Sequence, residues 1–386
     1  MEEETTLLEK DHRADFADFD DVIYLDVAHQ GPLPKASARA AQAAIEWKKL
    51  PHRLPEEEYF GLPDRVRVAA AKLIACRPEE IALTTGASGG LAAVANGLDW
   101  KPEDEVLFAR GEFPAQFATW LPLGESGRLT VKLIAPRERF ITADDFIAAI
   151  TSRTRLVSAS LVRFDDGSRL DAKRVAEACH AVGAYLLLDA SQCVGAMPLD
   201  VRALGADFVV SAGYKWLLSP YGTGLFWIRG ELIERMRPAP FYWMALEGAN
   251  KFHSLTFDRL RISPGARRWD APETSSFINL AAMEASLNYL LGVGLEKIWE
   301  HVDRLNRIIV DRLPRDRCVL ASPADSGRRG PIVCLAARHA EHTHELHEHL
   351  RQEKIFVSLR EGTIRIAPHL YNTERDIVRL ITVLSV

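Results

Sequence analysis

The stretch Asp207-Phe208-Val209-Val210-Ser211-Ala212-Gly213-Tyr214-Lys215-Trp216 decides how this chain is expected to fold. Its apolar first half predicts a buried strand, and Lys215 follows shortly after that strand ends. Further upstream, the apolar run Tyr185-Leu186-Leu187-Leu188 ends at Asp189 and continues as Ala190-Ser191-Gln192. Ligands of α/β sheets gather outside the carboxyl ends of the strands. We therefore expect Lys215 and Asp189 to face one site.

A lysine and an aspartate in these positions are the minimum set for binding pyridoxal 5'-phosphate (PLP). The lysine amine forms a Schiff base with the cofactor, and the carboxylate keeps the pyridine nitrogen protonated, so that the ring accepts electrons. A lysine in a strand-end turn is also an ordinary solvated group, since most lysines lie at the surface. The presence of Asp189 favours a PLP-binding site over a solvated surface lysine.

The chain around this site alternates between strand-like and helix-like segments. Apolar runs occur at residues 81–85, 105–109, 129–135, 156–162, 185–189, 208–211 and 224–228. Helical patterns lie between several of them, at residues 91–97, 144–150 and 172–182. The alternation predicts an α/β fold with a mostly parallel seven-stranded sheet, covered on both faces.

The pattern changes after about Leu280. Long helical stretches at 283–290 and 295–313 are followed by strand-like runs at 332–336, 355–359 and 363–366, and by a helix at 374–384. These elements predict a smaller α+β domain. We expect residues 31–293 to form the large, PLP-binding domain, and residues 1–30 with 294–386 to form the small domain.

A glycine-rich loop, Thr85-Gly86-Ala87-Ser88-Gly89-Gly90, ends a strand and opens a helix. Backbone N–H groups at such a turn bind a phosphate at the helix N-terminus. The loop also resembles the nucleotide loop of NAD(P)-dependent short-chain dehydrogenases. That loop normally follows the first strand of the chain, and its Tyr-x-x-x-Lys partner is missing here because Tyr214 and Lys215 are adjacent. A plain strand-to-helix turn is the third interpretation.

Composition narrows the classes of function. The net charge is -5, which gives no broad basic field for nucleic acid or an anionic membrane. No apolar stretch approaches the roughly 20 residues of a membrane span, and the acidic start Met1-Glu2-Glu3-Glu4 does not resemble a secretory signal. The five cysteines form no Cys-x-x-Cys pair, so we expect a cytoplasmic protein without disulfides or a metal site. The histidine-rich stretch 342–349 predicts the polar face of a helix.

Several motifs together resemble the class V aminotransferase family. They are residues 211–218 followed by 220–224, Glu112-Phe113-Pro114 with Trp120, residues 265–269, and residues 364–372. The family belongs to the fold-type I PLP-dependent enzymes, in the branch that contains cysteine desulfurases and isopenicillin N epimerase. The resemblance covers nearly the whole chain and implies a homodimer that acts on a small-molecule amino-acid substrate.

The resemblance also implies roles for individual residues. Lys215 would carry the Schiff base, and Asp189 would pair with the pyridine nitrogen. The remaining cofactor-binding residues would be Ala87, Ser88, Ser211 and Tyr214 around the phosphate, Gln192 near the ring hydroxyl, and Phe113 stacked on the ring. Arg365 would receive the substrate carboxylate, for which a planar guanidinium is suited. Thr274 or Ser275 would reach the phosphate of the other subunit. A core position for Phe113 and a structural ion pair for Arg365 are the alternatives.

The reaction itself is left open by these motifs. Cysteine desulfurases carry a nucleophilic cysteine on the loop ahead of the carboxylate-binding arginine, whereas residues 358–363 contain none. We expect an aminotransferase, with a C–S lyase or an amino-acid epimerase of the same family as the alternative. A more remote alternative is a non-catalytic module that binds PLP only as a sensor. Such a module would be expected to carry an appended DNA-binding segment, and none is visible in the sequence.

Overall fold

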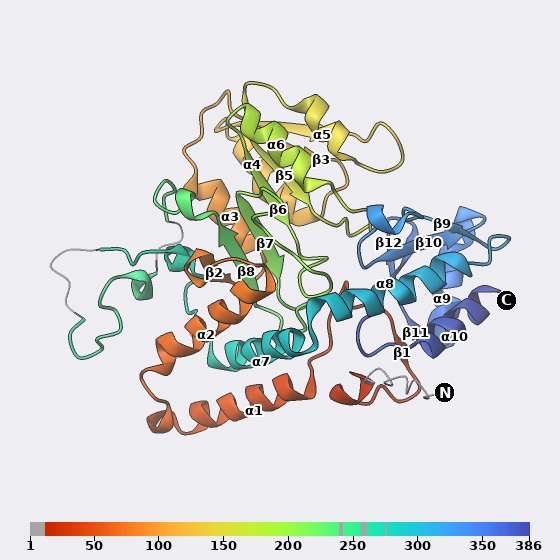
Figure 1. Ribbon diagram of the computed structural model, residues 1–386, viewed down its shortest axis with the longest axis horizontal. Helices are drawn as coiled ribbons and strands as arrows, with labels where there is room; N and C mark the ends of the chain where they lie inside the picture. Colours follow the sequence, from red (N-terminus) through yellow and green to blue (C-terminus); the bar gives the residue numbers. More distant parts are fainter. Residues whose placement is uncertain (1–11, 239–241, 256–260, 275) are drawn as a thin grey trace, which may run out of the picture.

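The computed structural model describes residues 12–238, 242–255, 261–274 and 276–386 of the chain. At its centre lies a seven-stranded sheet in the order β2-β8-β7-β6-β5-β3-β4 (Figure 1). Its strands are β2 Ile81–Thr84, β3 Glu105–Ala109, β4 Thr130–Ile134, β5 Thr154–Ser160, β6 Tyr185–Asp189, β7 Phe208–Ala212 and β8 Gly224–Ile228. Strand β8 runs antiparallel to both of its neighbours, β2 and β7, and the other four strand pairs of this sheet are parallel, so the predicted mostly parallel α/β sheet is confirmed.

Helices cover both faces of this sheet. They are α1 Lys35–Lys49, α2 Glu58–Leu73, α3 Ala87–Gly97, α4 Pro114–Glu125, α5 Ala143–Ala149, α6 Ala172–Ala181 and α7 Phe277–Val293. Side chains alternate between the faces along a strand, and in β7 Val209 joins one buried cluster while Phe208 and Val210 join the other. The first cluster includes residues of α2, α6 and α7, and the second includes residues of α3 and α4. Burial on both faces explains why these strands are apolar throughout.

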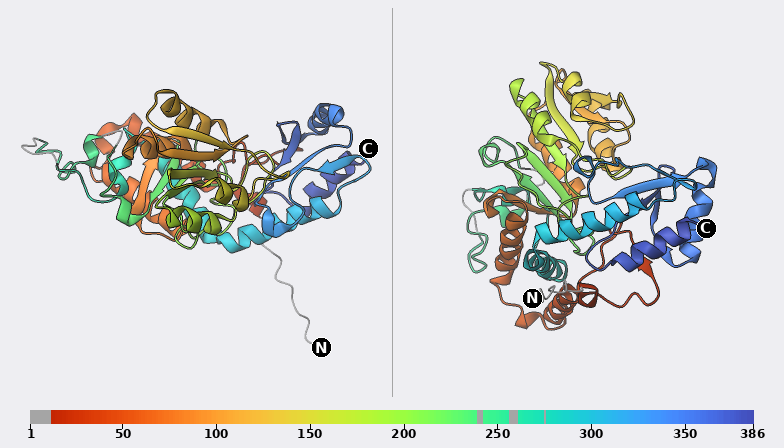
Figure 2. Two further views of the ribbon diagram at one scale, coloured as in Figure 1. Left: turned by 90° about the horizontal axis from the view of Figure 1, so that it is seen from above. Right: turned by 45° about the vertical axis from the view of Figure 1, so that its right-hand side comes forward.

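A second sheet lies beside the first rather than on its helical layers, as both views in Figure 2 indicate. It has the antiparallel order β12-β13-β10-β9. Its elements and the helices that accompany them are α8 Leu295–Asp311, β9 Cys318–Leu320, β10 Val333–Ala337, α9 Thr343–Gln352, β12 Ser358–Arg360, β13 Thr363–Ile366 and α10 Glu374–Leu384. Their apolar side chains share a separate buried cluster.

The beginning of the described chain joins this second part. Strand β1, Ile23–Tyr24, pairs in parallel with β11, Ile355–Phe356, and Asp26 forms a bridge with Ala367. Leu25 is buried in the same cluster as α8 and α10. The domain division at residues 31 and 293 stays a prediction, with these contacts in its favour.

Some elements differ from the sequence prediction. The run 355–359 forms two short strands, β11 and β12, and strand β9 and helix α4 were not predicted at all. Helix α4 begins with Pro114 and contains Pro122, and prolines inside a helix normally argue against it. Among the described residues, no single helix is long and apolar enough to cross a membrane; α7 and α8 meet the length and composition only as a pair bent by 79°.

Candidate active site

A cavity of about 140 Å³ lies at the carboxyl ends of the central strands. Its walls come from the β2–α3 loop, the start of α4, the end of β5, and the segments after β6 and β7. They consist of Thr85, Gly86, Ala87, Ser88, Gly89, Phe113, Ala115, Ser160, Val162, Phe164, Asp189, Ser191, Gln192, Ala212, Tyr214, Lys215 and Tyr221. Among the predicted site residues, the fold thus brings together Ala87, Ser88, Phe113, Asp189, Gln192, Tyr214 and Lys215. Ser211, Thr274 and Arg365 are not part of the wall.

Lys215 is buried, and its Nζ lies 5.1 Å from the ring centroid of Phe113 and 5.8 Å from that of Tyr214. Burial lowers the pKa of the amine to about 8; Asp189 opposes this shift, while Arg365 and Arg360 add to it. With this pKa, roughly a tenth to a fifth of the amine is neutral at about pH 7 to 7.4, far more than for an exposed lysine, and this neutral fraction can act as a nucleophile or a general base.

The backbone of Lys215 is held by the segment that follows β1. Gly31 N donates to Tyr214 O over 2.8 Å. A Cβ atom at Gly31 would lie 2.1 Å from the carbonyl oxygen of Lys215, so only glycine permits this approach. The beginning of the chain thereby positions the lysine.

Asp189 ends β6 and is tied to the neighbouring strand. Its Oδ1 accepts from Ser191 N over 2.9 Å, and Ser191 Oγ accepts from Ala212 N over 3.0 Å. Within the described residues Asp189 forms no ion pair with Lys215. The carboxylate and the amine thus face one cavity, and each remains able to bind a ligand there.

Gln192 is oriented by two buried contacts. Its Oε1 accepts from Trp216 Nε1 over 2.9 Å, and its Nε2 donates to Ala28 O over 3.2 Å. One Nε2 hydrogen remains for a ligand in the cavity. Trp216 in turn packs against His369 at 5.7 Å between ring centroids, and burial lowers the pKa of His369 to about 3, so this imidazole is neutral at ordinary pH.

The glycine-rich loop forms the N-terminus of α3, as the sequence indicates. Gly86 has φ 156°, and Ala87 and Ser88 open the helix. The first-turn N–H groups, which have no partner inside a helix, are suited to an anion. Ser211 lies behind this wall; it is buried and its hydroxyl donates to Ala212 O over 3.3 Å.

Phe113 caps the start of α4 and is 38% exposed, so it is not a core aromatic. Its ring stands edge-on to Phe164, with 5.3 Å between centroids and an interplanar angle of 85°. Lys215 Nζ lies over its face. The ring is therefore free to cover a ligand bound at Lys215.

Arg365 lies behind the cavity wall and is buried. Its Nη2 donates to Asp26 Oδ1 over 3.2 Å and to Ser358 Oγ over 3.3 Å, and its Nη1 donates to Phe164 O over 3.2 Å. Its Nε has no hydrogen-bond partner. The arginine is thus held by an ion pair, as in the structural alternative, and retains one free donor.

Residues 23–380 match the family model of class-V aminotransferases. The chain belongs to this family. It is a PLP-dependent enzyme, and the match leaves the dehydrogenase alternative without support.

Curated relatives of this member of the class-V aminotransferase family carry several names. The uncharacterized aminotransferase YcbU of Bacillus subtilis is 29% identical over 306 residues, which cover 79% of this chain and 78% of YcbU. A probable cysteine desulfurase of Streptomyces coelicolor is 27% identical, with 93% and 90% covered. Isopenicillin N epimerase of Streptomyces clavuligerus is 26% identical, with 93% of each chain covered.

Solved structures agree on the fold. The apo cysteine desulfurase of Thermococcus onnurineus matches with a TM-score of 0.85 at 21% identity, covering 97% of this chain and 96% of its own. A mutant of C-DES with glycine covalently linked to its PLP cofactor also has a TM-score of 0.85, at 20% identity, covering 97% of this chain and 98% of its own. These likenesses identify the fold-type I architecture.

Two further predicted residues lie apart from the cavity. Thr274 lies near Tyr242 and Arg267, and its hydroxyl donates to Ala271 O. Ser275 lies outside the described residues. The predicted contact of Thr274 with the phosphate of another subunit stays a prediction.

Two arginines lie near the site. Arg163 is engaged by Asp165 at 2.6 Å and by Gly111 O at 2.6 Å. Arg360, which sequence reasoning did not select, contributes to the electrostatic environment of Lys215. Its position in the turn where desulfurases carry their cysteine was the available signal.

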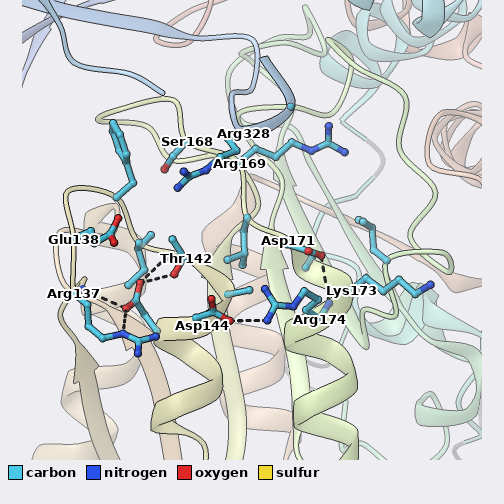
Figure 3. Close-up of a pocket in the computed structure, with 18 residues that line it drawn as sticks. Arg137, Glu138, Thr142, Asp144, Ser168, Arg169, Asp171, Lys173, Arg174 and Arg328 are labelled. Carbon is cyan, nitrogen blue, oxygen red and sulfur yellow. Dashed lines mark hydrogen bonds and ion pairs between the residues drawn. The ribbon is translucent and has the colours of Figure 1, made fainter. Parts of the chain in front are cut away.

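A larger cavity of about 810 Å³ opens elsewhere, between α5, α6 and the turn at residues 327–328. Two of its arginines are neutralised, because Arg137 pairs with Asp145 at 2.8 Å and Arg174 pairs with Asp144 at 2.6 Å (Figure 3). None of the predicted site residues lines it. Size alone therefore does not identify the reactive site.

Proposed function

We propose that this enzyme is an aminotransferase that acts on amino acids through Lys215. The observation that carries the proposal is the buried amine of Lys215, with a pKa of about 8, in one cavity with Asp189 and the N-terminus of α3. When bound, PLP supplies an electron sink that stabilises negative charge at the substrate Cα.

The residues of the cavity fit this cofactor. Asp189 offers a carboxylate oxygen to the pyridine nitrogen, and the N–H groups of Ala87 and Ser88 suit the phosphate. Phe113 covers the ring, and Gln192 offers its remaining amide hydrogen to the ring hydroxyl. Tyr214 adds a wall beside Lys215, whereas Ser211 acts only by supporting that wall.

Lys215 has two tasks in this scheme. Its amine would hold the cofactor, and once a substrate amine had replaced it, the neutral Nζ would be free to remove the proton from the substrate Cα and to return it. Full transamination would also need release of the keto acid and a second half-reaction with an acceptor keto acid. We assign the substrate carboxylate to Arg365, whose orientation Asp26 fixes. Its unpartnered Nε–H is buried, so the carboxylate reaches it only when the contact of Arg365 with Phe164 O in the cavity wall opens.

A C–S lyase is the second candidate. A cystine C–S lyase, C-DES, has a TM-score of 0.85 with this chain at 20% identity, and the turn at residues 358–363 lacks a cysteine. The same Cα deprotonation followed by loss of a β-substituent gives this reaction, and reprotonation of Cα from the opposite face gives epimerisation. A purely PLP-binding module has no observation in its favour.

One experiment separates these reactions. The purified enzyme is incubated with a panel of amino acids, with and without a keto acid, and the products are identified. Keto-acid-dependent amino transfer is expected; release of pyruvate and sulfide alone, or a change of chirality alone, would contradict the aminotransferase. Borohydride reduction and peptide mapping should find the cofactor on Lys215, and finding it on another lysine would refute the assignment of the site.

A further inference from the structure

Trp216, the residue after Lys215, is fully buried and lies behind the wall of the active-site cavity. Its Nε1 donates to Oε1 of Gln192 over 2.9 Å, and Gln192 lines the cavity. The indole also packs against His369, with 5.7 Å between the ring centroids. Two neighbouring residues of the chain therefore serve the same cavity in different ways: Lys215 lines it, and Trp216 holds another residue that lines it.

The two partners of Gln192 fix the orientation of its amide. An indole N–H is a donor only, and a backbone carbonyl oxygen is an acceptor only. Oε1 faces Trp216 Nε1, and Nε2 donates to Ala28 O over 3.2 Å. Exchanging the amide oxygen and nitrogen would bring donor against donor and acceptor against acceptor among buried groups, which is unfavourable. The second Nε2 hydrogen, which has no partner among the described residues, is therefore the group that Gln192 offers to the cavity.

The loop that carries Gln192 is also fixed to the segment after Lys215 through the backbone. A Cβ atom at Gly195 would lie 2.4 Å from the carbonyl oxygen of Trp216, and Gly195 has φ 98°. Only glycine permits this approach. At the start of the same loop, Ala190 N donates to the carbonyl oxygen of Val210 in β7 over 2.8 Å. The fold thus holds the indole and the amide at hydrogen-bond distance before any ligand binds.

We propose that Trp216 is a positioning residue for the cofactor: by holding Oε1 of Gln192, it directs the free Nε2–H to the ring hydroxyl of PLP. The inference rests on the proposed function, which assigns that hydroxyl to Gln192. A donor at this place stabilises the ionised form of the hydroxyl. Without the indole N–H, Oε1 is a buried acceptor that lacks a partner, and the amide turns to satisfy it, which moves Nε2 away from the hydroxyl.

The test compares two ligands on the full-length enzyme, reconstituted either with PLP or with the PLP analogue that lacks the ring hydroxyl. Trp216→Phe keeps an aromatic ring beside His369 and removes the N–H. Its dissociation constant for PLP should rise about tenfold, as expected when a hydrogen bond to a charged group is lost, and that for the analogue by less than about twofold. Loss of folded protein cancels in the ratio of the two constants, because both ligands bind the same preparation.

A second variant shows whether Trp216 acts through Gln192. Gln192→Ala alone should lower the preference for PLP over the analogue about tenfold or more. Adding Trp216→Phe to Gln192→Ala should change this preference by less than about twofold, because changes that remove one shared contact are not additive.

The chain offers a matched control for this comparison. Trp120 Nε1 donates to Gln116 Oε1 over 2.9 Å, both side chains are buried, and neither lines the cavity. Trp120→Phe therefore removes the same kind of bond elsewhere and should leave the preference for PLP over the analogue unchanged. If Trp216→Phe does not fold, benzothienylalanine at position 216 gives the same comparison, since its ring has the shape of indole and no N–H.

Two results would overturn the inference. One is an unchanged preference for PLP in Trp216→Phe while Gln192→Ala loses it, because Gln192 then keeps its orientation without the indole. The other is an equal loss for both ligands, which indicates a role in packing alone. If Gln192→Ala also keeps the preference, the assignment of the ring hydroxyl to Gln192 fails as well, so the failure of the proposed site is distinguishable from the failure of Trp216.

Discussion

At the scale of the residue, Lys215 depends on its surroundings for reactivity. Burial disfavours the ammonium form, Asp189 partly restores it, and Arg365 and Arg360 disfavour it further. The same side chain on the surface would be protonated at pH 7 and inert as a nucleophile. The neighbours of the lysine therefore matter as much as its place after β7.

The first prediction concerns the pH dependence of Lys215. In the cofactor-free protein its acylation by an amine-directed reagent should rise with pH and reach half its maximum near pH 8, since the pKa is lowered from 10.5 to about 8 and only the neutral amine reacts. Mass spectrometry of the Lys215 peptide measures this rate. An exposed lysine such as Lys101 provides the control. A Lys215 midpoint as high as that of the exposed control would contradict the buried site.

The second prediction concerns Asp189. Asp189→Ala should reduce kcat/KM by about 10²-fold or more, the size of a single electrostatic contribution at an active site. It should also shift the acylation midpoint of Lys215 to lower pH, because Asp189 raises that pKa. Asp99→Ala, at an exposed ion pair with Arg237, is the control. Near-normal turnover in Asp189→Ala would show that Asp189 is not the carboxylate that pairs with the pyridine nitrogen.

At the scale of the element, strand ends and turns decide which side chains meet. The ends of β6 and β7 place Asp189 and Lys215 on one cavity. The β12–β13 turn carries Arg360, whose charge lowers the pKa of Lys215. That turn contains no thiol. The cysteines of the chain are buried or half-buried, and burial raises the pKa of Cys76, Cys179, Cys193 and Cys334 to about 12.

The third prediction is that no cysteine persulfide forms during turnover. A thiol with a pKa near 12 is almost entirely protonated at neutral pH and is a poor nucleophile. Cys193, the neighbour of Gln192, is fully buried and its Sγ contacts Ala190 O at 3.3 Å. Cys193→Ser should therefore keep its activity, and any sulfur released from cysteine should appear as free sulfide with pyruvate. Trapping a persulfide, with alanine as the product, would contradict this.

Sequence patterns predict some of the strands and helices better than others. The bounds of β3, β6 and β8 agree with the apolar runs, because a strand buried on both faces needs a continuous apolar segment. Helix α4 was missed because its prolines hide the helical pattern. Strand β9 was missed because only Cys318 of its three residues is buried.

At the scale of the whole molecule, the two sheets meet beside the cavity and the first described residues join them. Asp26 follows β1 and pairs with Arg365, while Gly31 approaches Lys215. Thr274 lies away from the cavity of its own chain. Tyr221 lines the cavity yet is 70% exposed, which leaves the rim open to a second copy of the chain.

The fourth prediction is that the enzyme is a homodimer. Light scattering should give twice the chain mass of 43.1 kDa at the concentrations used for assays. If Thr274 completes the phosphate site of the partner, Thr274→Ala should weaken PLP binding without changing the mass. Thr382→Ala, at an exposed hydroxyl on α10, should leave PLP affinity unchanged. A fully active monomer would refute the prediction.

The sequence by itself determined the alternation of strands and helices, the anion-binding loop, and Lys215 and Asp189 at strand ends, because these features depend on local apolar patterns and on residue chemistry. Only the tertiary structure decided which side chains are matched: Arg365 with Asp26, Arg163 with Asp165, and Ser211 with the carbonyl of Ala212. It also decided that Arg360 has no such partner among the described residues. The Arg365–Asp26 pair joins residues 339 positions apart, and no local pattern encodes which distant charges the packed chain brings together.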